Sequence, residues 1–254
     1  MMRLKNKSSI VTGASRGIGK AIAFAFASEG ANVIVIYRNS KKKAIEVSEL
    51  IKSQYKVKSA AIKADVSLLK DIAELISSAE KFFGSIDILV NNAGVGSRAA
   101  FTDVTEEQFN QAINLNLKGP FFLTQAVAKH MIAHSKTGSI INISSISSFK
   151  AELNISAYEC AKAGESMLTK SAALALAPHH IRVNTISPGL TATDMTQSIN
   201  DPLARPLSER AQPIPLGRVG QPKDHAGAAI FLASGESSWI TGSNIIVDGG
   251  ESIK

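Results

Sequence analysis

A tyrosine and a lysine lie four residues apart in the stretch SAYECAKAG, as Tyr158 and Lys162. In a helix, side chains at this spacing share one face and are neighbours. A phenol has a pKa of about 10 and is a poor base at neutral pH, but a cation beside it favours the phenolate and lowers that pKa. The pair is therefore a candidate proton donor and acceptor, although the same spacing occurs by chance on many helices.

Two polar stretches follow apolar runs that have the character of buried strands. Ser145, thirteen residues before Tyr158, ends the run SIINISS, and Asn91–Gly94 (NNAG) follows the run IDILV. Ligands of open α/β sheets bind at the carboxyl ends of the strands. The Ser145 hydroxyl is therefore placed to hydrogen-bond a substrate oxygen beside the phenol.

Three glycines, Gly13, Gly17 and Gly19, interrupt the stretch IVTGASRGIGKA between an apolar run and a helical pattern. Glycine allows sharp turns and a close approach of the backbone to a ligand. A helix that begins here offers free N–H groups and the positive end of its dipole, which together bind phosphate. The spacing predicts a phosphate-binding loop, and the alternative is a tight turn without a ligand.

The end of the second predicted strand indicates which dinucleotide fits. An NAD site places Asp or Glu there for the ribose 2′-hydroxyl, whereas this chain has Tyr37, Arg38 and then Lys41–Lys43. Together with Arg16 in the glycine loop, these cations favour a 2′-phosphate, and hence NADP(H) over NAD(H). A basic face exposed to solvent is the alternative, above all for the lysines.

Short β-rich runs alternate with helical patterns along the chain, which is typical of right-handed βαβ crossovers and a parallel sheet. Runs such as VIVI and SIINI are apolar on both faces, as in strands that helices cover on both sides. We predict strands at Ser9–Thr12, Asn32–Tyr37, Val57–Ala64, Ile86–Asn91, Ser139–Ser144, Arg182–Ser187 and Asn244–Val247. Helices are predicted at Ile18–Glu29, Lys42–Gln54, Leu69–Phe83, Thr105–Ser135 (as two helices), Tyr158–Leu176 and Lys223–Ala233.

The predicted fold class is α/β: a single Rossmann-like, doubly wound, parallel seven-stranded sheet with helices on both faces. We expect one domain over 1–254, with a cofactor half at about 1–137 and a catalytic half at about 138–254.

The composition excludes some classes of function. The 254 residues carry a net charge of +7, which favours acidic partners such as phosphorylated cofactors. The cations are scattered without interleaved aromatics, so we expect no nucleic-acid binding. Cys160 is the only cysteine, so a disulfide or a cysteine-cluster metal site is excluded, no metal is expected, and a reducing, cytoplasmic compartment fits. No apolar run is long enough for a signal peptide or a membrane span.

One segment lacks periodicity: Pro188–Pro222 holds six of the eight prolines. Long loops in compact domains are usually functional or mobile. We expect Leu190–Pro215 to close over the site as a lid, with Thr191, Thr193 and Thr196 hydrogen-bonding the cofactor. The alternative is a static surface loop.

From about Ser8 to Gly250 the chain resembles the short-chain dehydrogenase/reductases. The motifs that carry the resemblance are TGASRGIG, ADV at 64–66, NNAG, NLNLKGPFF, the Ser145–Tyr158–Lys162 set, SPGLTATDM, PLGRVGQPKDHAGAAIFLAS and ITGSNIIVDGG. Each motif alone is modest, but in this order and at family spacing they are specific. The resemblance implies a catalytic set of Asn116, Ser145, Tyr158 and Lys162. It implies cofactor contacts at Gly13, Ser15, Arg16, Gly17, Ile18, Gly19, Arg38, Asp65, Val66, Asn92, Ala93, Gly94, Tyr158, Lys162, Pro188, Gly189, Thr191 and Thr193.

The resemblance also implies a mechanism, in which hydride passes from the nicotinamide to a carbonyl carbon. Tyr158 would donate the proton, and Ser145 would polarise the carbonyl oxygen. Lys162 would hold the nicotinamide ribose and lower the pKa of Tyr158. Asn116 would position a water that links Lys162 to solvent.

The general pattern is most similar to the 3-oxoacyl-[acyl-carrier-protein] reductases, which implies fatty acid biosynthesis, an acyl-thioester substrate and acyl carrier protein as a partner. Sugar and polyol dehydrogenases are the alternative, because the segment between Ser145 and Tyr158 lacks the glycines common in the reductases. A non-catalytic NADP(H)-binding regulatory protein is an alternative of another class. The substrate side is expected at Ser145, Phe149 and Tyr158. The apolar helices FFLTQAVAKHMIAH and CAKAGESMLTKSAALALA predict a homotetramer.

Overall fold

A parallel seven-stranded sheet forms the centre of the protein, with the strand order β3-β2-β1-β4-β5-β6-β7. The computed structural model describes residues 2–196, 209, 212 and 214–254. Every pair of neighbouring strands is parallel. The strands are β1 (Ser8–Val11), β2 (Asn32–Tyr37), β3 (Ser59–Lys63), β4 (Ile88–Asn91), β5 (Gly138–Ile143), β6 (Ile181–Pro188) and β7 (Asn244–Val247). The Rossmann-like fold predicted from the sequence is confirmed.

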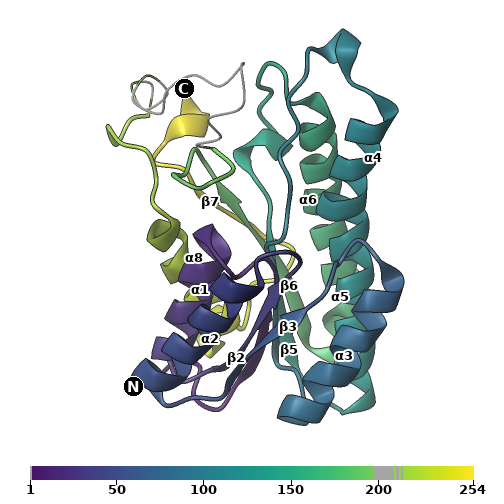
Figure 1. Ribbon diagram of the computed structural model, residues 1–254, viewed down its shortest axis with the longest axis vertical. Coiled ribbons are helices and arrows are strands. Elements are labelled where there is room, and N and C mark those ends of the chain that lie inside the picture. Colours follow the sequence, from purple (N-terminus) through teal and green to yellow (C-terminus); the bar gives the residue numbers. More distant parts are fainter. Residues whose placement is uncertain (1, 197–208, 210–211, 213) are drawn as a thin grey trace.

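Helices cover both faces of this sheet (Figure 1). One layer holds α1 (Gly17–Ser28), α2 (Lys41–Tyr55) and α8 (Ala226–Ala233), and the other holds α3 (Leu69–Phe83), α4 (Glu106–Ile113), α5 (Gly119–Ala133) and α6 (Ser156–Leu176). Strand β2 shows why both faces are apolar. Val33 and Val35 pack into the core under α1 and α2, whereas Ile34 and Ile36 pack into the opposite core, because successive side chains of a strand point to opposite faces.

The helical run predicted as two helices over Thr105–Ser135 is continuous but irregular. Thr105 caps α4 through a capping box with Gln108. A π-helical turn, η2 (Asn114–Lys118), then joins α4 to α5. Such turns insert an extra residue into a helix and are frequent at functional sites. Here the turn contains Asn116, one of the predicted site residues.

The described residues also form short 3₁₀ turns: η1 (Phe101–Asp103), η3 (Ile146–Ser148), η4 (Ala177–His179), η5 (Pro222–His225), η6 (Gly235–Ser237) and η7 (Glu251–Ile253). Turn η5 accounts for the first residues of the helix predicted at Lys223–Ala233. Within the described residues, no helix is both long and apolar enough to cross a membrane.

Candidate active site

The strand order reverses between β1 and β4, whose connections leave on opposite faces of the sheet. The carboxyl edge at such a reversal is where open α/β sheets bind ligands. The glycine loop follows β1, the NNAG turn follows β4, and Ser145 follows β5. The sheet therefore brings three of the predicted motifs to one edge.

Lys162 lies on the second turn of α6 and is 4 % exposed. Its ammonium donates hydrogen bonds to the backbone oxygen of Ile143 at 2.7 Å and to Oε2 of Glu165 at 2.6 Å. Nζ lies 5.9 Å from the ring centre of Tyr158. Burial acts to lower the pKa of Lys162, but the charges of Glu165 and Tyr158 raise it. The lysine is therefore a buried cation beside the phenol ring.

Ser145 occupies the N-cap of η3, two residues after the end of β5 at Ile143. Its hydroxyl accepts a hydrogen bond from the backbone N–H of Ser147 and donates one to Oγ of Ser147, both at 3.1 Å. Turn η3 packs against α6, the helix that carries Tyr158 and Lys162. The serine and the phenol are both half-buried, so the edge remains accessible where the sequence predicts chemistry.

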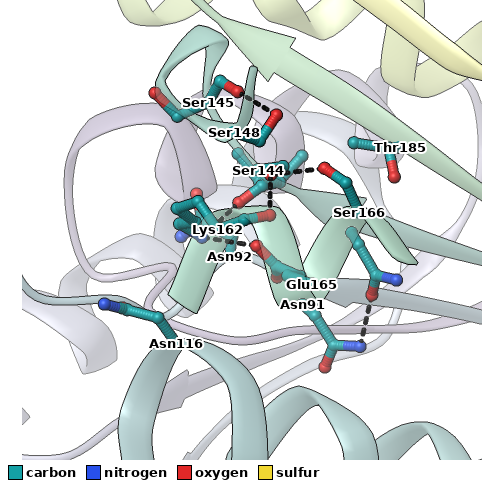
Figure 2. A network of polar contacts seen from close by, with 12 residues as sticks. Asn91, Asn92, Asn116, Ser144, Ser145, Ser148, Lys162, Glu165, Ser166 and Thr185 are labelled. Carbon is teal, nitrogen blue, oxygen red and sulfur yellow. Dashed lines mark hydrogen bonds and ion pairs between the residues drawn. The ribbon is translucent and has the colours of Figure 1, made fainter. Parts of the chain in front are cut away.

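A buried polar network lies beneath this edge (Figure 2). The Asn91 amide donates hydrogen bonds to Thr124 and to Asn142, and Asn142 donates to Thr169. Thr169 donates in turn to the backbone oxygen of Glu165. Satisfied networks of this kind rigidify a core, and this one joins β4, β5 and α6 below Lys162.

Asn116 is fully buried in the π-helical turn. Its side-chain oxygen accepts from the backbone N–H of Val95 at 2.8 Å, and its amide nitrogen donates to the Val95 oxygen at 2.9 Å. Next to Val95, a Cβ on Gly94 would lie 2.8 Å from Oδ1 of Asn116. The amide therefore fixes the backbone that follows the NNAG turn, a bond that the sequence did not predict.

The glycine loop is a close-packed turn with an open helix end. Gly13 and Gly17 have positive φ angles of 63° and 57°, a region that glycine enters without strain. A Cβ on Gly13 would lie 3.0 Å from both the Ala93 Cα and Nδ2 of Asn92. Among the described residues, no side chain caps α1, whose N-cap is Arg16. The N–H groups of its first turn thus lack a capping side chain, as an anion site requires.

The two predicted phosphate-binding arginines each have an acidic partner. Arg16 lies 3.2 Å from Asp194, and Arg38 lies 3.6 Å from Asp65, measured between the charged atoms. Burial acts to raise the pKa of Asp65, but hydrogen bonds from Ser67 and the charge of Arg38 lower it. Because β1 and β2 are paired in parallel, both arginines follow strand ends at the same edge.

Two threonines predicted to contact the cofactor, Thr191 and Thr193, lie in the segment after β6 and have different surroundings. Thr193 faces the glycine loop, because a Cβ on Gly17 would lie 3.5 Å from its Cγ2. Thr191 is buried instead, and its hydroxyl contacts Nε2 of His225 at 2.9 Å and donates to the Gly189 oxygen. Burial lowers the pKa of His225 to about 4. Most of the predicted lid, Leu190–Pro215, lies outside the described residues.

Phe149, predicted to line the substrate side, is 51 % exposed at the end of η3. It borders a cavity of about 260 Å³ whose other walls come from α6, β6 and the start of β7. Tyr158 does not line this cavity.

One group of potential metal ligands occurs in the described part of the chain: Glu80, His130 and His134. Nε2 of His134 lies 3.2 Å from Oε1 of Glu80, as an ion pair when the histidine is protonated. These residues lie near the C-terminal ends of α3 and α5. They are at the opposite edge of the sheet from Lys162.

Glu165 is the residue of this region that the sequence analysis missed. It is 1 % exposed and forms the ion pair with Lys162. The available signal was its spacing, since a carboxylate three residues after a lysine shares its helix face.

Comparisons with known proteins bear on the family and the fold of the chain. The profile of the family described as enoyl-(acyl carrier protein) reductase matches residues 13–252. A 3-oxoacyl-[acyl-carrier-protein] reductase FabG of Staphylococcus epidermidis is 42 % identical over 245 residues, which cover 96 % of this chain and 98 % of that protein. Galactitol 2-dehydrogenase of Agrobacterium fabrum is 38 % identical over 259 residues, 98 % of each chain. A crystal structure of a short-chain type dehydrogenase/reductase from Mycobacterium marinum superimposes with a TM-score of 0.93 at 36 % identity, covering 100 % of this chain and 98 % of the other.

Proposed function

The chain belongs to the short-chain dehydrogenase/reductase family of oxidoreductases, which use a nicotinamide cofactor, and we propose that it is an NADP(H)-dependent reductase of 3-oxoacyl thioesters. The observation that carries the chemistry is the buried ammonium of Lys162, 5.9 Å from the ring centre of Tyr158. A cation at that place stabilises the phenolate and so makes the phenol a better proton donor.

Each residue of the proposed catalytic set has a distinct task. Tyr158 donates the proton to the carbonyl oxygen, and Ser145 hydrogen-bonds the same oxygen. Lys162 tunes the pKa of Tyr158 and holds the ribose. Asn116 holds the backbone at Val95 with both ends of its amide and positions a water that links Lys162 to solvent. The cofactor, when bound, supplies the hydride.

The residues at the carboxyl edge fit a dinucleotide. The uncapped start of α1 suits a pyrophosphate, and a Cβ on Gly13 would fill the space beside Ala93. We assign the 2′-phosphate to Arg16 and Arg38, since no carboxylate occupies the end of β2, where Tyr37 stands. The other proposed contacts are Ser15, Ile18, Gly19, Asp65, Val66, Asn92, Gly94, Pro188, Gly189 and Thr193.

A 3-oxoacyl thioester is proposed as substrate because of the likeness to 3-oxoacyl-[acyl-carrier-protein] reductases at 42 % identity. The net charge of +7 suits an acidic carrier protein as the partner that delivers it. The second candidate is polyol oxidation, favoured by the 38 % identity to galactitol 2-dehydrogenase.

The test is NADPH oxidation with 3-oxoacyl thioesters, simple ketones and sugars, together with NADP⁺ reduction by polyols. Tyr158→Phe should lower kcat by about 10²–10⁴-fold and leave NADPH binding, followed by fluorescence, unchanged. The matched control is Tyr55→Phe, because Tyr55 packs edge-on against Phe24 far from this edge. Near-normal activity of Tyr158→Phe would contradict the assignment, and turnover of polyols alone would favour the second candidate.

A further inference from the structure

The side chain of Glu165 is a carboxylate buried directly against the proposed catalytic lysine (Figure 2). Oε2 of Glu165 accepts a hydrogen bond of 2.6 Å from Nζ of Lys162. The two residues are 1 % and 4 % exposed. A buried ion pair costs desolvation energy and is weak evidence for stability in itself, so its position beside Tyr158 suggests a role in the reaction.

Lys162 is the only charged group that acts on Glu165 among the described residues. The other groups of the surrounding hydrogen-bonded network are uncharged amides and hydroxyls. They are Asn91 of β4, Asn142 of β5, Thr124 of α5, Thr169 and Ser166 of α6, and Thr185 of β6. The charge on Glu165 is therefore felt by Lys162 and, through it, by Tyr158, which also interacts electrostatically with Lys162.

We propose that Glu165 is a positioning residue that sets the protonation of Tyr158 through Lys162. Its carboxylate holds the ammonium and offsets part of its charge, so that Tyr158 stays a protonated donor to higher pH. This inference rests on the proposed function, in which Tyr158 donates the proton.

The geometry of the ammonium explains the positioning. A lysine ammonium has three N–H donors. Glu165 and the backbone oxygen of Ile143 take two of them, at 2.6 and 2.7 Å. These two bonds fix the orientation of the ammonium, so the third N–H is left to donate to the phenol or to a ribose hydroxyl.

The charge of Glu165 changes near neutral pH. Burial raises the pKa of its carboxyl to about 7, against the opposing effect of Lys162. Above that pH the carboxylate neutralises much of the Lys162 charge and weakens the effect of that charge on the Tyr158 phenol. Below it Glu165 is neutral, and Lys162 acts on Tyr158 with its full charge.

The first test measures the phenol without turnover. The chain has three tyrosines, so the ultraviolet phenolate titration of Tyr158 is the difference between the wild type and Tyr158→Phe. Glu165→Gln keeps the shape and removes the charge, and it should lower the pKa of Tyr158 by about one unit. Glu165→Asp keeps the charge, so the pKa of Tyr158 in this variant should stay close to the wild-type value. If Glu165→Gln does not fold, Glu165→Met provides the same loss of charge.

The second test is the pH profile of kcat/KM for reduction. The alkaline decline should begin about one unit lower in Glu165→Gln than in the wild type. At low pH, where burial favours the protonated Glu165 carboxyl, the two proteins should react at equal rates. Glu159→Gln, which removes the other carboxylate of α6, is the control and should leave the profile unchanged.

The two tests separate the inference from the proposed function. An unshifted Tyr158 titration in Glu165→Gln would overturn the inference, as would an equal loss of rate at every pH, which indicates a merely structural role. A shifted titration without turnover of any carbonyl would leave the inference standing and refute the proposed reductase.

Discussion

Gly19 offers the sharpest test of how closely the glycine loop packs. Gly19 lies in the first turn of α1, where alanine should gain up to about 1 kcal/mol of helix propensity. A Cβ there would, however, lie 2.8 Å from the Gly13 oxygen and closer still to Nδ2 of Asn92. Asn92 cannot give way easily, because its amide donates to the Thr12 oxygen at 2.8 Å. Overpacking costs about 1–3 kcal/mol, so Gly19→Ala should be destabilised by up to about 2 kcal/mol net and should lose NADPH affinity.

The matched control is Gly227→Ala. Gly227 lies in the first turn of α8, and apart from its chain neighbours and the backbone of its own helix, no atom of the described residues lies within 4 Å of the position of its Cβ. Here the propensity gain is unopposed, so the variant should be more stable by up to about 1 kcal/mol. Urea unfolding, with the midpoints compared at equal m-values, measures both changes. If Gly19→Ala proved as stable as Gly227→Ala, the loop would not be packed as described.

Three further predictions concern the cofactor, pH and assembly. Arg38→Asp should lower the ratio of kcat/KM for NADPH over NADH by about 10–100-fold, the value of a charged hydrogen bond; equal ratios in variant and wild type would refute the 2′-phosphate assignment. Burial lowers the pKa of His225 to about 4. Between about pH 4 and about pH 6.5, the unfolded chain therefore binds a proton at this histidine that the folded chain does not bind. Unfolding free energy should fall by up to about 3 kcal/mol as pH drops from about 6.5 to about 4, and His225→Gln should abolish this part of the pH dependence. Light scattering should give the mass of a tetramer, since α5 and α6 expose Phe121, Met167 and Leu174; a monomer would contradict this.

The sheet and its helices could be predicted from the sequence because their signals are local. β-rich apolar runs between helical patterns located the seven strands of the described residues, and the observed ends differ from the predicted ones by at most two residues. The π-helical turn at Asn114–Lys118 had no such signal. The Asn116 side chain in this turn bonds to the backbone of Val95, which is 21 residues away in the sequence, so a local pattern could not reveal it.

The candidate site likewise has features that the local sequence predicted and features that only the folded structure shows. The four-residue spacing placed Tyr158 and Lys162 on one helix face, but the sequence could not show that Thr191 is buried against His225. Glu165 was harder still, because a glutamate on a helix is normally at the surface. Its burial depends on Lys162 as a partner and on α6 packing against β5 and β6, which is a property of the assembled fold.

The acidic partners of the two arginines bear on how cofactor preference is built. Arg16 and Arg38 are about half exposed in their ion pairs with Asp194 and Asp65, and exposed pairs contribute about 0–1 kcal/mol. A bidentate arginine–phosphate contact is stronger, so a 2′-phosphate can replace these carboxylates as the partner. Arg38→Asp would also place a second carboxylate beside Asp65, and this new carboxylate would itself repel the phosphate. Arg38→Gln lacks that repulsion, so the difference between the two variants separates the loss of the cation from the gain of an anion.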